Sequence, residues 1–337
     1  MLEAFYATER GSLEDATING GFDLHPELVW VDLIAPSQEE QEWVFDAYEQ
    51  NLPTLKSLED ISSSARFYRD DDGILHISTY FLTKNKNYQV EGDPDDSTNM
   101  LATVQTVAFI LHKNRLFTLR GEKLVAFRAF RARARRNDYD IDYKDPTWIL
   151  LGLLEAKLDE LADILEDIHK DLESYSTEVL NVRHREMILD LDDMITRLAQ
   201  KEDMLGKAQL CLIDLRRVLT FLSRPRALGS HIYDADIREL SEDVRSLVEH
   251  DAFLFQKVRF LLDTTSGFIN TEQNDTIRRF SILPSMLAPP MLIASIYGMN
   301  TEVLPFAHGS TSFYVVITIL IAFFVGPLIY FRWKKWI

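Results

Sequence analysis

Residues 281–301, with the sequence SILPSMLAPPMLIASIYGMNT, contain no charged side chain. A second uncharged stretch covers residues 313–331 and is rich in Ile, Val, Leu and Phe. At about 1.5 Å per residue, a helix formed by either stretch can cross the hydrocarbon core of a membrane, which is about 30 Å thick. We therefore predict two transmembrane helices, at residues 281–299 and 313–331, joined by an extracytoplasmic loop at residues 300–312.

The charges beside these stretches predict how the chain is oriented. Basic side chains flank both stretches on the sides away from the loop, at Arg278, Arg279, Arg332, Lys334 and Lys335. The loop carries only Glu302 and the nearly neutral His308. Because basic flanks stay on the cytoplasmic side of a membrane, residues 1–280, the tail at residues 332–337 and both termini are predicted to be cytoplasmic.

The chain as a whole is acidic. It has 53 Asp and Glu residues against 36 Lys and Arg residues, which gives a net charge of −17. This balance argues against nucleic acid as a partner, because phosphates need a cationic surface. It favours cations as partners, although a requirement for solubility would also explain it. The single cysteine, Cys211, lies in an apolar run and is predicted to be a buried thiol in a reducing compartment.

Residues 1–145 carry signals for both strands and helices. Strands are predicted at residues 28–33, 74–82, 103–111 and 115–120. Lys113 and Asn114 predict a tight turn between the last two strands, and Ser37 and Glu40 have the spacing of a capping box at a helix start. We expect a mixed α+β domain, with a strand order that the sequence leaves open.

Residues 146–280 are predicted to be helical, because apolar residues recur at spacings of three and four from Thr147 onward. A second helix covers residues 186–222, and a third begins near Asp234. The third helix has no Pro or Gly before Gly267, and if this glycine is tolerated the helix continues into the first span, over more than about sixty residues. A helix of this length is expected to pack against other long helices or against copies of itself.

Several kinds of chemical site are missing from the sequence. It has no G-x-x-x-x-G-K-[ST] motif, no H-E-x-x-H motif and no paired cysteines. We therefore expect no enzyme and no nucleotide site, so that any transport must run downhill. A basic run contains Arg128, Arg131, Arg133, Arg135 and Arg136. We interpret this run as a helix face that pairs with the surplus acids rather than as an RNA-binding surface.

A short motif stands at the end of the first uncharged stretch and consists of Tyr297, Gly298, Met299 and Asn300. In this position it resembles the signature of the CorA family of magnesium channels. Further stretches are similar to the same family, at residues 58–61, 65–67, 255–258, 267–270, 272–274, 289–295 and 330–337. The resemblance therefore covers most of the chain.

The resemblance implies a funnel-shaped homopentamer in the inner membrane of a bacterium. In this architecture a long stalk helix continues into the pore-lining first span, and the second span lies outside it. It also implies that Gly298, Met299 and Asn300 form the ion-selecting loop through which Mg²⁺ enters the cell.

Such a mouth has a physical rationale. Mg²⁺ requires octahedral oxygen ligands and loses its water reluctantly. A ring of neutral oxygens, from the Asn300 side chains and the Gly298 carbonyls, would hold the hydrated ion without trapping it. A ring of carboxylates would bind the ion more tightly and slow its release, whereas conduction needs weak binding.

Counting back from Asn300 at helical spacing places uncharged residues on one face of the first span. They are Ser295, Met291, Ala288, Pro284, Ser281, Ile277 and Asn274. We predict that this face lines the pore, although packing between helices would also explain its apolar members. Pro284 departs from the family pattern and is expected to kink the helix.

The resemblance also implies roles for residues on and near this face. A hydrophobic constriction, which acts as the gate, is implied at Met291, Ala288, Ile277 and Phe280. Contacts with the metal ion are implied at Asn300, Asn274 and Asp263.

The third helix carries seven acids, Asp234, Asp236, Glu239, Glu242, Asp243, Glu249 and Asp251. The resemblance implies that acids at subunit interfaces bind internal Mg²⁺ and hold the channel closed. Glu239, Glu242 and Asp243 are the candidates for such regulatory sites. A solvated helix face is the alternative for any one of them.

Two other functions remain open. One is a transporter of Co²⁺, Ni²⁺ or Zn²⁺ on the same scaffold, but Met299 matches the magnesium branch, and the pore region has no thiolate or imidazole that would favour softer metals. The other is a membrane-tethered coiled-coil scaffold that conducts nothing. It would explain the long helices but not the motif at Gly298, Met299 and Asn300.

Overall fold

The computed structural model describes residues 1–16, 28–59, 66–84, 102–136, 141–181, 188–225, 227–299 and 310–334. The chain forms two compact units. The first unit comprises Met1–Val182 and Asp193–Leu261, and the second comprises Arg183–Asp192 and Leu262–Ile337.

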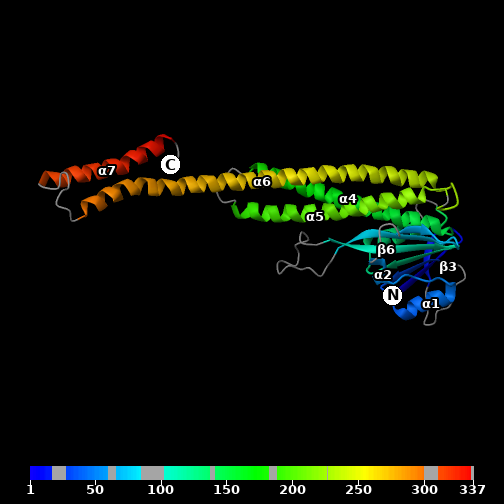
Figure 1. The fold of residues 1–337 in the computed structure, drawn as a ribbon. Coiled ribbons are helices and arrows are strands. Elements are labelled where there is room, and N and C mark those ends of the chain that lie inside the picture. The colour runs from blue at the N-terminus through cyan, green and yellow to red at the C-terminus, as the bar shows by residue number, and fades with distance from the viewer. Residues whose placement is uncertain are drawn as a thin grey trace. The chain divides into compact units, whose positions relative to one another are not determined.

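A seven-stranded mixed sheet organises the first unit (Figure 1). Its strands are β1 (Leu2–Ala7), β2 (Leu13–Ala16), β3 (Leu28–Ile34), β4 (Phe67–Arg69), β5 (Leu75–Lys84), β6 (Ala102–His112) and β7 (Arg115–Arg120). Their order is β2-β1-β3-β7-β6-β5-β4, in which β3 and β7 are parallel and the other described neighbours are antiparallel. The strand predictions at β3, β5, β6 and β7 are confirmed to within two residues, whereas β1, β2 and β4 were not predicted.

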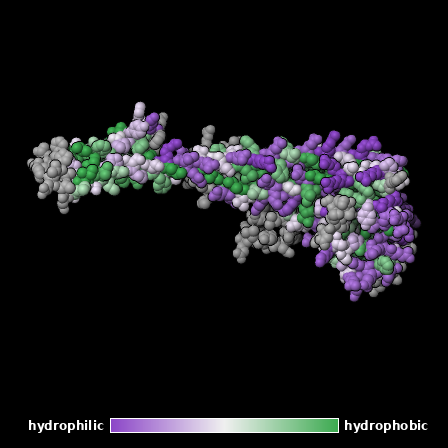
Figure 2. Space-filling model, in the orientation of Figure 1, coloured by the Kyte–Doolittle hydropathy of each residue, from purple (hydrophilic) through white to green (hydrophobic). Residues whose placement is uncertain are grey.

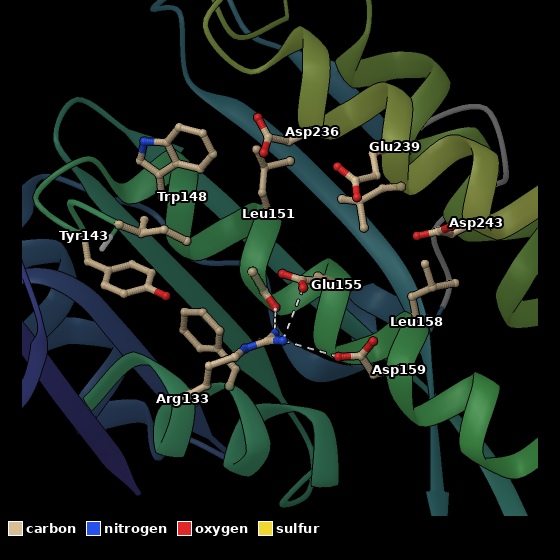
Figure 3. A pocket seen from close by; sticks show the side chains of 14 residues that line it. Arg133, Tyr143, Trp148, Leu151, Glu155, Leu158, Asp159, Asp236, Glu239 and Asp243 are labelled. Atoms are coloured by element: carbon tan, nitrogen blue, oxygen red, sulfur yellow. Dashed lines mark hydrogen bonds and ion pairs between the residues drawn. The ribbon is translucent and has the colours of Figure 1, made fainter. Parts of the chain in front are cut away.

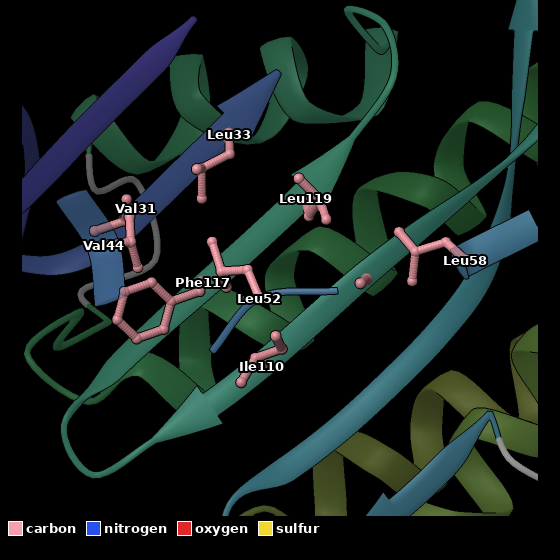
Figure 4. Close-up of a cluster of buried hydrophobic side chains, with 9 residues drawn as sticks. Val31, Leu33, Val44, Leu52, Leu58, Ile110, Phe117 and Leu119 are labelled. Carbon is pink, nitrogen blue, oxygen red and sulfur yellow. The ribbon is translucent and has the colours of Figure 1, made fainter. Parts of the chain in front are cut away.

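Helices cover both faces of the sheet. On one face, α1 (Gln38–Tyr48) and α2 (Leu55–Glu59) lie over a cluster of buried hydrophobic side chains around Val31, Leu33 and Phe117 (Figure 4). The predicted capping box starts α1, because the Ser37 side chain accepts from the Glu40 backbone N–H. Since β3 is buried along its whole length, it is the centre of the core.

On the other face, α3 (Val125–Arg136) places Phe127 and Phe130 against Trp30 of β3. A buried ion pair lies beneath them, in which Arg120 Nη2 contacts Asp32 Oδ2 at 2.6 Å. The guanidinium of Arg120 also lies 4.3 Å from the ring centre of Phe127. This charge is therefore paired and covered, as a buried charge must be.

The basic run lies on α3, and its charges pair with acids of the first unit. Arg131 pairs with Glu3, Arg135 pairs with Asp15, and Arg133 contacts Glu155 at 3.2 Å and Asp159 at 3.4 Å. The interpretation of this run as an acid-pairing helix face is confirmed for these three of its five arginines.

Three long helices follow, namely α4 (Pro146–Asn181), α5 (Ile188–Leu222) and α6 (Asp234–Tyr297). Polar contacts join them, since Lys201 of α5 pairs with Asp171 of α4, and His169 of α4 contacts His250 of α6 at 3.2 Å between ring nitrogens. The expectation of one helix of more than sixty residues is confirmed, because α6 has 64 residues.

A buried polar network ties α4 and α5 to the sheet. Lys157 of α4 donates to Thr79 of β5 at 2.8 Å, and Asp214 of α5 accepts from the backbone N–H of Tyr80 at 2.9 Å. Burial lowers the pKa of Lys157, while Asp214 opposes this shift. Cys211 is buried as predicted, and burial raises its thiol pKa to about 11. This thiol is therefore neutral and unreactive at physiological pH.

Asp251 of α6 is a buried acid of a different kind. Its side chain is fully buried, and neither carboxylate oxygen has a hydrogen-bond partner. Burial raises its pKa from 3.8 to about 6. Between about pH 4 and pH 6 the folded chain keeps a proton on Asp251 that the unfolded chain has lost. The free energy of unfolding therefore falls as the pH rises through this window.

We predict that Asp251→Asn stabilises the protein at pH 7.5 by about 2–3 kcal/mol, because the amide needs no proton to be buried uncharged. At pH 4 the variant and the parent should have nearly equal stability. Chemical denaturation of the detergent-solubilised protein at both pH values measures the effect, with the exposed Glu249→Gln as control. Equal stability of variant and parent at pH 7.5 would contradict the prediction.

Candidate ion pathway and acidic pocket

Among the residues that the structure describes, two helices are long and apolar enough to cross a membrane. They are α6, through its C-terminal part, and Phe313–Trp333 within α7 (Ser310–Trp333). In the most apolar 18-residue segment of α6, 11% is buried inside the chain, and in that of α7 the buried share is 0%. Figure 2 shows hydrophobic surface on this part of the molecule. So much exposed apolar surface requires lipid or another protein surface to cover it.

Within the second unit, the C-terminal part of α6 has two different faces. Ile282 and Met286 are buried, each with 7% exposure, and Pro289, Ile293 and Tyr297 are half-buried. At about 100° per residue these side chains lie on one side of the helix. This side, which we call the packing face, is the one that the chain itself covers.

The residues predicted to line the pore lie on the opposite side, which we call the pathway face. All of its predicted members are exposed, namely Asn274, Ile277, Ser281, Pro284, Ala288, Met291 and Ser295, and so is Phe280 of the implied gate. Asp263 is also exposed, and at helical spacing it lies on the same side as Asn274. The structure thus aligns the predicted residues along one helix face that a single chain leaves uncovered.

The hydroxyl groups near this face are bonded to their own helix. Ser281 Oγ donates to the Ile277 carbonyl at 2.7 Å, and Ser285 Oγ donates to the Ser281 carbonyl at 2.8 Å. A serine in this arrangement keeps its oxygen lone pairs available as acceptors. The pathway face can therefore offer oxygen ligands to a hydrated cation at Ser281.

The motif at the end of α6 tightens the last turn of the helix. The Gly298 N–H donates to the Ala294 carbonyl at 2.9 Å, and the Met299 N–H donates to the Ile296 carbonyl at 3.2 Å. A Cβ atom on Gly298 would lie 3.3 Å from the Ala294 oxygen, which is closer than side chains usually approach. Glycine is favoured here by this crowding rather than by a left-handed backbone. Asn300, which we predicted to be the main ion ligand, lies outside the described residues.

Some acids of α6 line a cavity of about 500 Å³ in the first unit (Figure 3). Carboxylates line it from two helices, with Glu155 and Asp159 on α4 and Asp236, Glu239 and Asp243 on α6. Arg133 of α3 is the basic residue in its lining. Five carboxylates against one guanidinium make this acidic pocket attractive to cations.

The charges within the pocket act on one another. Burial raises the pKa of Glu155, Arg133 opposes this shift, and the carboxylates of Asp159, Glu239 and Asp236 increase it. Burial likewise raises the pKa of Asp159, with a further contribution from Asp243. A bound cation would relieve this repulsion, so cation binding and proton release are linked in the pocket.

The structure separates the three acids that we proposed as regulatory. Glu239 and Asp243 line the acidic pocket, whereas Glu242 is exposed and lies outside its lining. We did not predict Glu155 and Asp159, although their spacing of four residues places them on one helix face. Within the described part of the chain, no three acidic, imidazole or thiol side chains already converge as a metal site. Glu239 and Asp243 would therefore have to move, or act with a second chain, to hold an ion.

The family model described as "CorA-like Mg2+ transporter protein" matches residues 26–335. The chain belongs to the CorA-like Mg²⁺ transporter family. The magnesium transport protein CorA of Pectobacterium atrosepticum is 40% identical over 309 residues, which cover 92% of each chain. That of Escherichia coli is 39% identical over 316 residues, again 92% of each chain. The resemblance found in the sequence is confirmed, and so is the expectation that the chain is no enzyme, because this family comprises transporters.

Among solved structures, the CorA magnesium transporter of Methanocaldococcus jannaschii superposes with a TM-score of 0.75. It is 19% identical and is matched over 100% of this chain and 99% of its own. At this identity the similarity concerns the fold alone. It confirms the fold predicted for the CorA-like chain, a mixed domain followed by a long helix and a terminal apolar helix.

We predict that the two faces of α6 differ in their access to water. In a Cys211→Ala background, Ser281→Cys and Ser295→Cys should react with a charged thiol reagent at least tenfold faster than Ile282→Cys, because thiols react as thiolates in water. The reaction rates are measured on protein reconstituted into liposomes. Equal rates for Ser281→Cys and Ile282→Cys would show that the pathway face is not the wet face.

Proposed function

We propose that this protein conducts Mg²⁺ into the cell through a pore formed by several copies of the chain. The observation that carries the proposal is the pathway face of α6, which is uncharged from Ser281 to Met299, exposed in the single chain, and ends at the Gly298–Met299 motif. Membership of the transporter family and relatives named magnesium transport protein support the choice of ion.

The pore lies in the bacterial inner membrane, with both chain termini in the cytoplasm and the Asn300 loop outside. Hydrated Mg²⁺ binds the ring of Asn300 side chains and Gly298 carbonyls, then passes Met291, Ala288 and the constriction at Phe280. The membrane potential drives entry. At about 2.3 kcal/mol per charge per 100 mV, a divalent cation gains about 4.6 kcal/mol for each 100 mV of inside-negative potential. No nucleotide is therefore needed.

Assembly of five copies would cover the apolar surface that one chain leaves exposed. Ile277, Phe280 and Met291 are each more than 60% exposed in the single chain. Phe253 and Phe260, seven residues apart on α6 in the first unit, are 52% and 62% exposed. Residues spaced by seven lie on one side of a helix and are typical of contacts between long helices.

Internal Mg²⁺ would regulate the pore through the acidic pocket. The pocket brings Glu239 and Asp243 of α6 opposite Glu155 and Asp159 of α4. A divalent cation that bridges these carboxylates would hold α6 against α4 and favour one position of the helix. Because α6 also carries the pathway face, its position can bias the pore between closed and open.

We predict that Asn300→Ala reduces Mg²⁺ influx into dye-loaded liposomes at least tenfold, because it removes the amide oxygens of the mouth. The influx of the parent protein should rise with an inside-negative potential. Asn51→Ala, at an exposed position of the first unit, is the matched control and should conduct like the parent. Flux of Co²⁺, Ni²⁺ or Zn²⁺ without Mg²⁺ would overturn the choice of ion, and no flux of any divalent ion would favour the non-conducting scaffold.

We also predict that the double variant Glu239→Gln and Asp243→Asn weakens inhibition by internal Mg²⁺. The concentration for half-inhibition should rise at least fivefold, because two negative charges of the pocket are lost. The exposed Glu249→Gln should leave this concentration unchanged. Unchanged inhibition in the double variant would show that regulation does not run through the pocket.

A further inference from the structure

Three prolines lie inside α6, at Pro284, Pro289 and Pro290. A proline has no backbone N–H, so each of them deprives the carbonyl four residues earlier of its helical donor, and its ring pushes that carbonyl away from the helix axis. The carbonyls released in this way belong to Phe280, Ser285 and Met286.

The three released carbonyls do not point to the same side of the helix. Pro290 is half-buried and Met286, whose carbonyl it releases, is buried on the packing face, whereas Pro289 is half-buried and its partner Ser285 is exposed. Pro284 is exposed, as is Phe280, which is 74% exposed, and the gap between them opens on the pathway face. Pro284 and Pro290 therefore release carbonyl oxygens on opposite sides of the helix, which makes Pro290 the control for Pro284.

The neighbouring hydroxyl does not replace the missing donor. Ser285, directly after Pro284, donates its hydroxyl to the Ser281 carbonyl at 2.8 Å. Ser281 donates its own hydroxyl to Ile277 at 2.7 Å. Both bonds go to carbonyls that already have a helical N–H donor, so the Phe280 carbonyl gains nothing from either serine.

An oxygen in this position cannot face lipid at low cost. Pro284 lies five residues after Arg279, so the Phe280 carbonyl points into the first turns of the uncharged span. An unsatisfied carbonyl in hydrocarbon costs several kcal/mol, and unpaired backbone groups at membrane depth are found where they face protein or line a water-filled cavity. The side opposite to the packing face is thus favoured as the wet side.

We propose that the Phe280 carbonyl oxygen, released by Pro284, forms a cation-binding ring in the pore, with one oxygen from each subunit. This proposal rests on the proposed function, since it needs a pore along the pathway face. The ligand is a hydrated divalent cation, which the ring holds through the water molecules of the ion. Mg²⁺ keeps several of its waters when it binds, and neutral carbonyl oxygens bind weakly enough to let an ion leave.

The ring would solve a problem of the apolar constriction. Ile277 and Phe280 present only hydrocarbon side chains at this level, which offer no oxygen ligand to a doubly charged ion. Five carbonyl dipoles at the same level would stabilise the hydrated ion as it passes. The apolar side chains would still exclude water and ions when the pore is narrow.

The test compares Mg²⁺ influx in liposomes for Pro284→Ala and Pro290→Ala. Pro284→Ala restores an N–H at residue 284 and returns the Phe280 carbonyl to the helix, so influx should fall at least fivefold. Pro290→Ala restores an N–H on the packing face and should stay within twofold of the parent. Size-exclusion chromatography of each variant checks that assembly is unchanged.

A third variant separates the missing N–H from the proline ring. In the Pro284→Ala protein, the amide N–H of residue 284 is replaced by an ester oxygen, which removes the donor without a ring. Influx should return to within twofold of the parent. Full influx in Pro284→Ala, or failure of the ester to restore it, would overturn the carbonyl ring. Absence of influx in the parent protein itself would instead refute the proposed function.

Discussion

The structure depends on one constraint, that a backbone crossing hydrocarbon must satisfy its own N–H and C=O groups. This constraint makes both spans helical, and it means that an ion pathway has to be built from helix faces and helix ends. We propose that in this chain the face is that of α6 and the end is the tightened turn at Gly298 and Met299. Prolines inside α6 release carbonyl oxygens from this rule, and for the oxygen released by Pro284 we propose a partner in the pore.

The same helix serves two environments. In the first unit, α6 buries Val244, Leu254 and Val258, and in the second it leaves Ile277 and Phe280 exposed. α6 is one helix of 64 residues, and its residues line the acidic pocket in the first unit and form the pathway face in the second.

Buried charges in the first unit are of two kinds. Asp32 with Arg120, and Lys157 with Thr79, are satisfied by close partners and tie helices and strands to one core. Asp251 has no such partner and destabilises the fold at neutral pH. The contrast follows from the high cost of an unpaired buried charge compared with a paired one.

The sequence by itself determined the local features of this protein. The apolar runs, the capping box at Ser37 and the missing helix breakers between Asp234 and Gly267 act over a few residues, so the spans, α1 and the length of α6 could be predicted. Only the tertiary structure decided the strand order and the acidic pocket, because Glu155 and Glu239 are far apart in the chain and meet through packing. It also separated Glu242 from Glu239 and Asp243, since neighbouring helical residues point about 100° apart and only contact with another helix shows which side is enclosed.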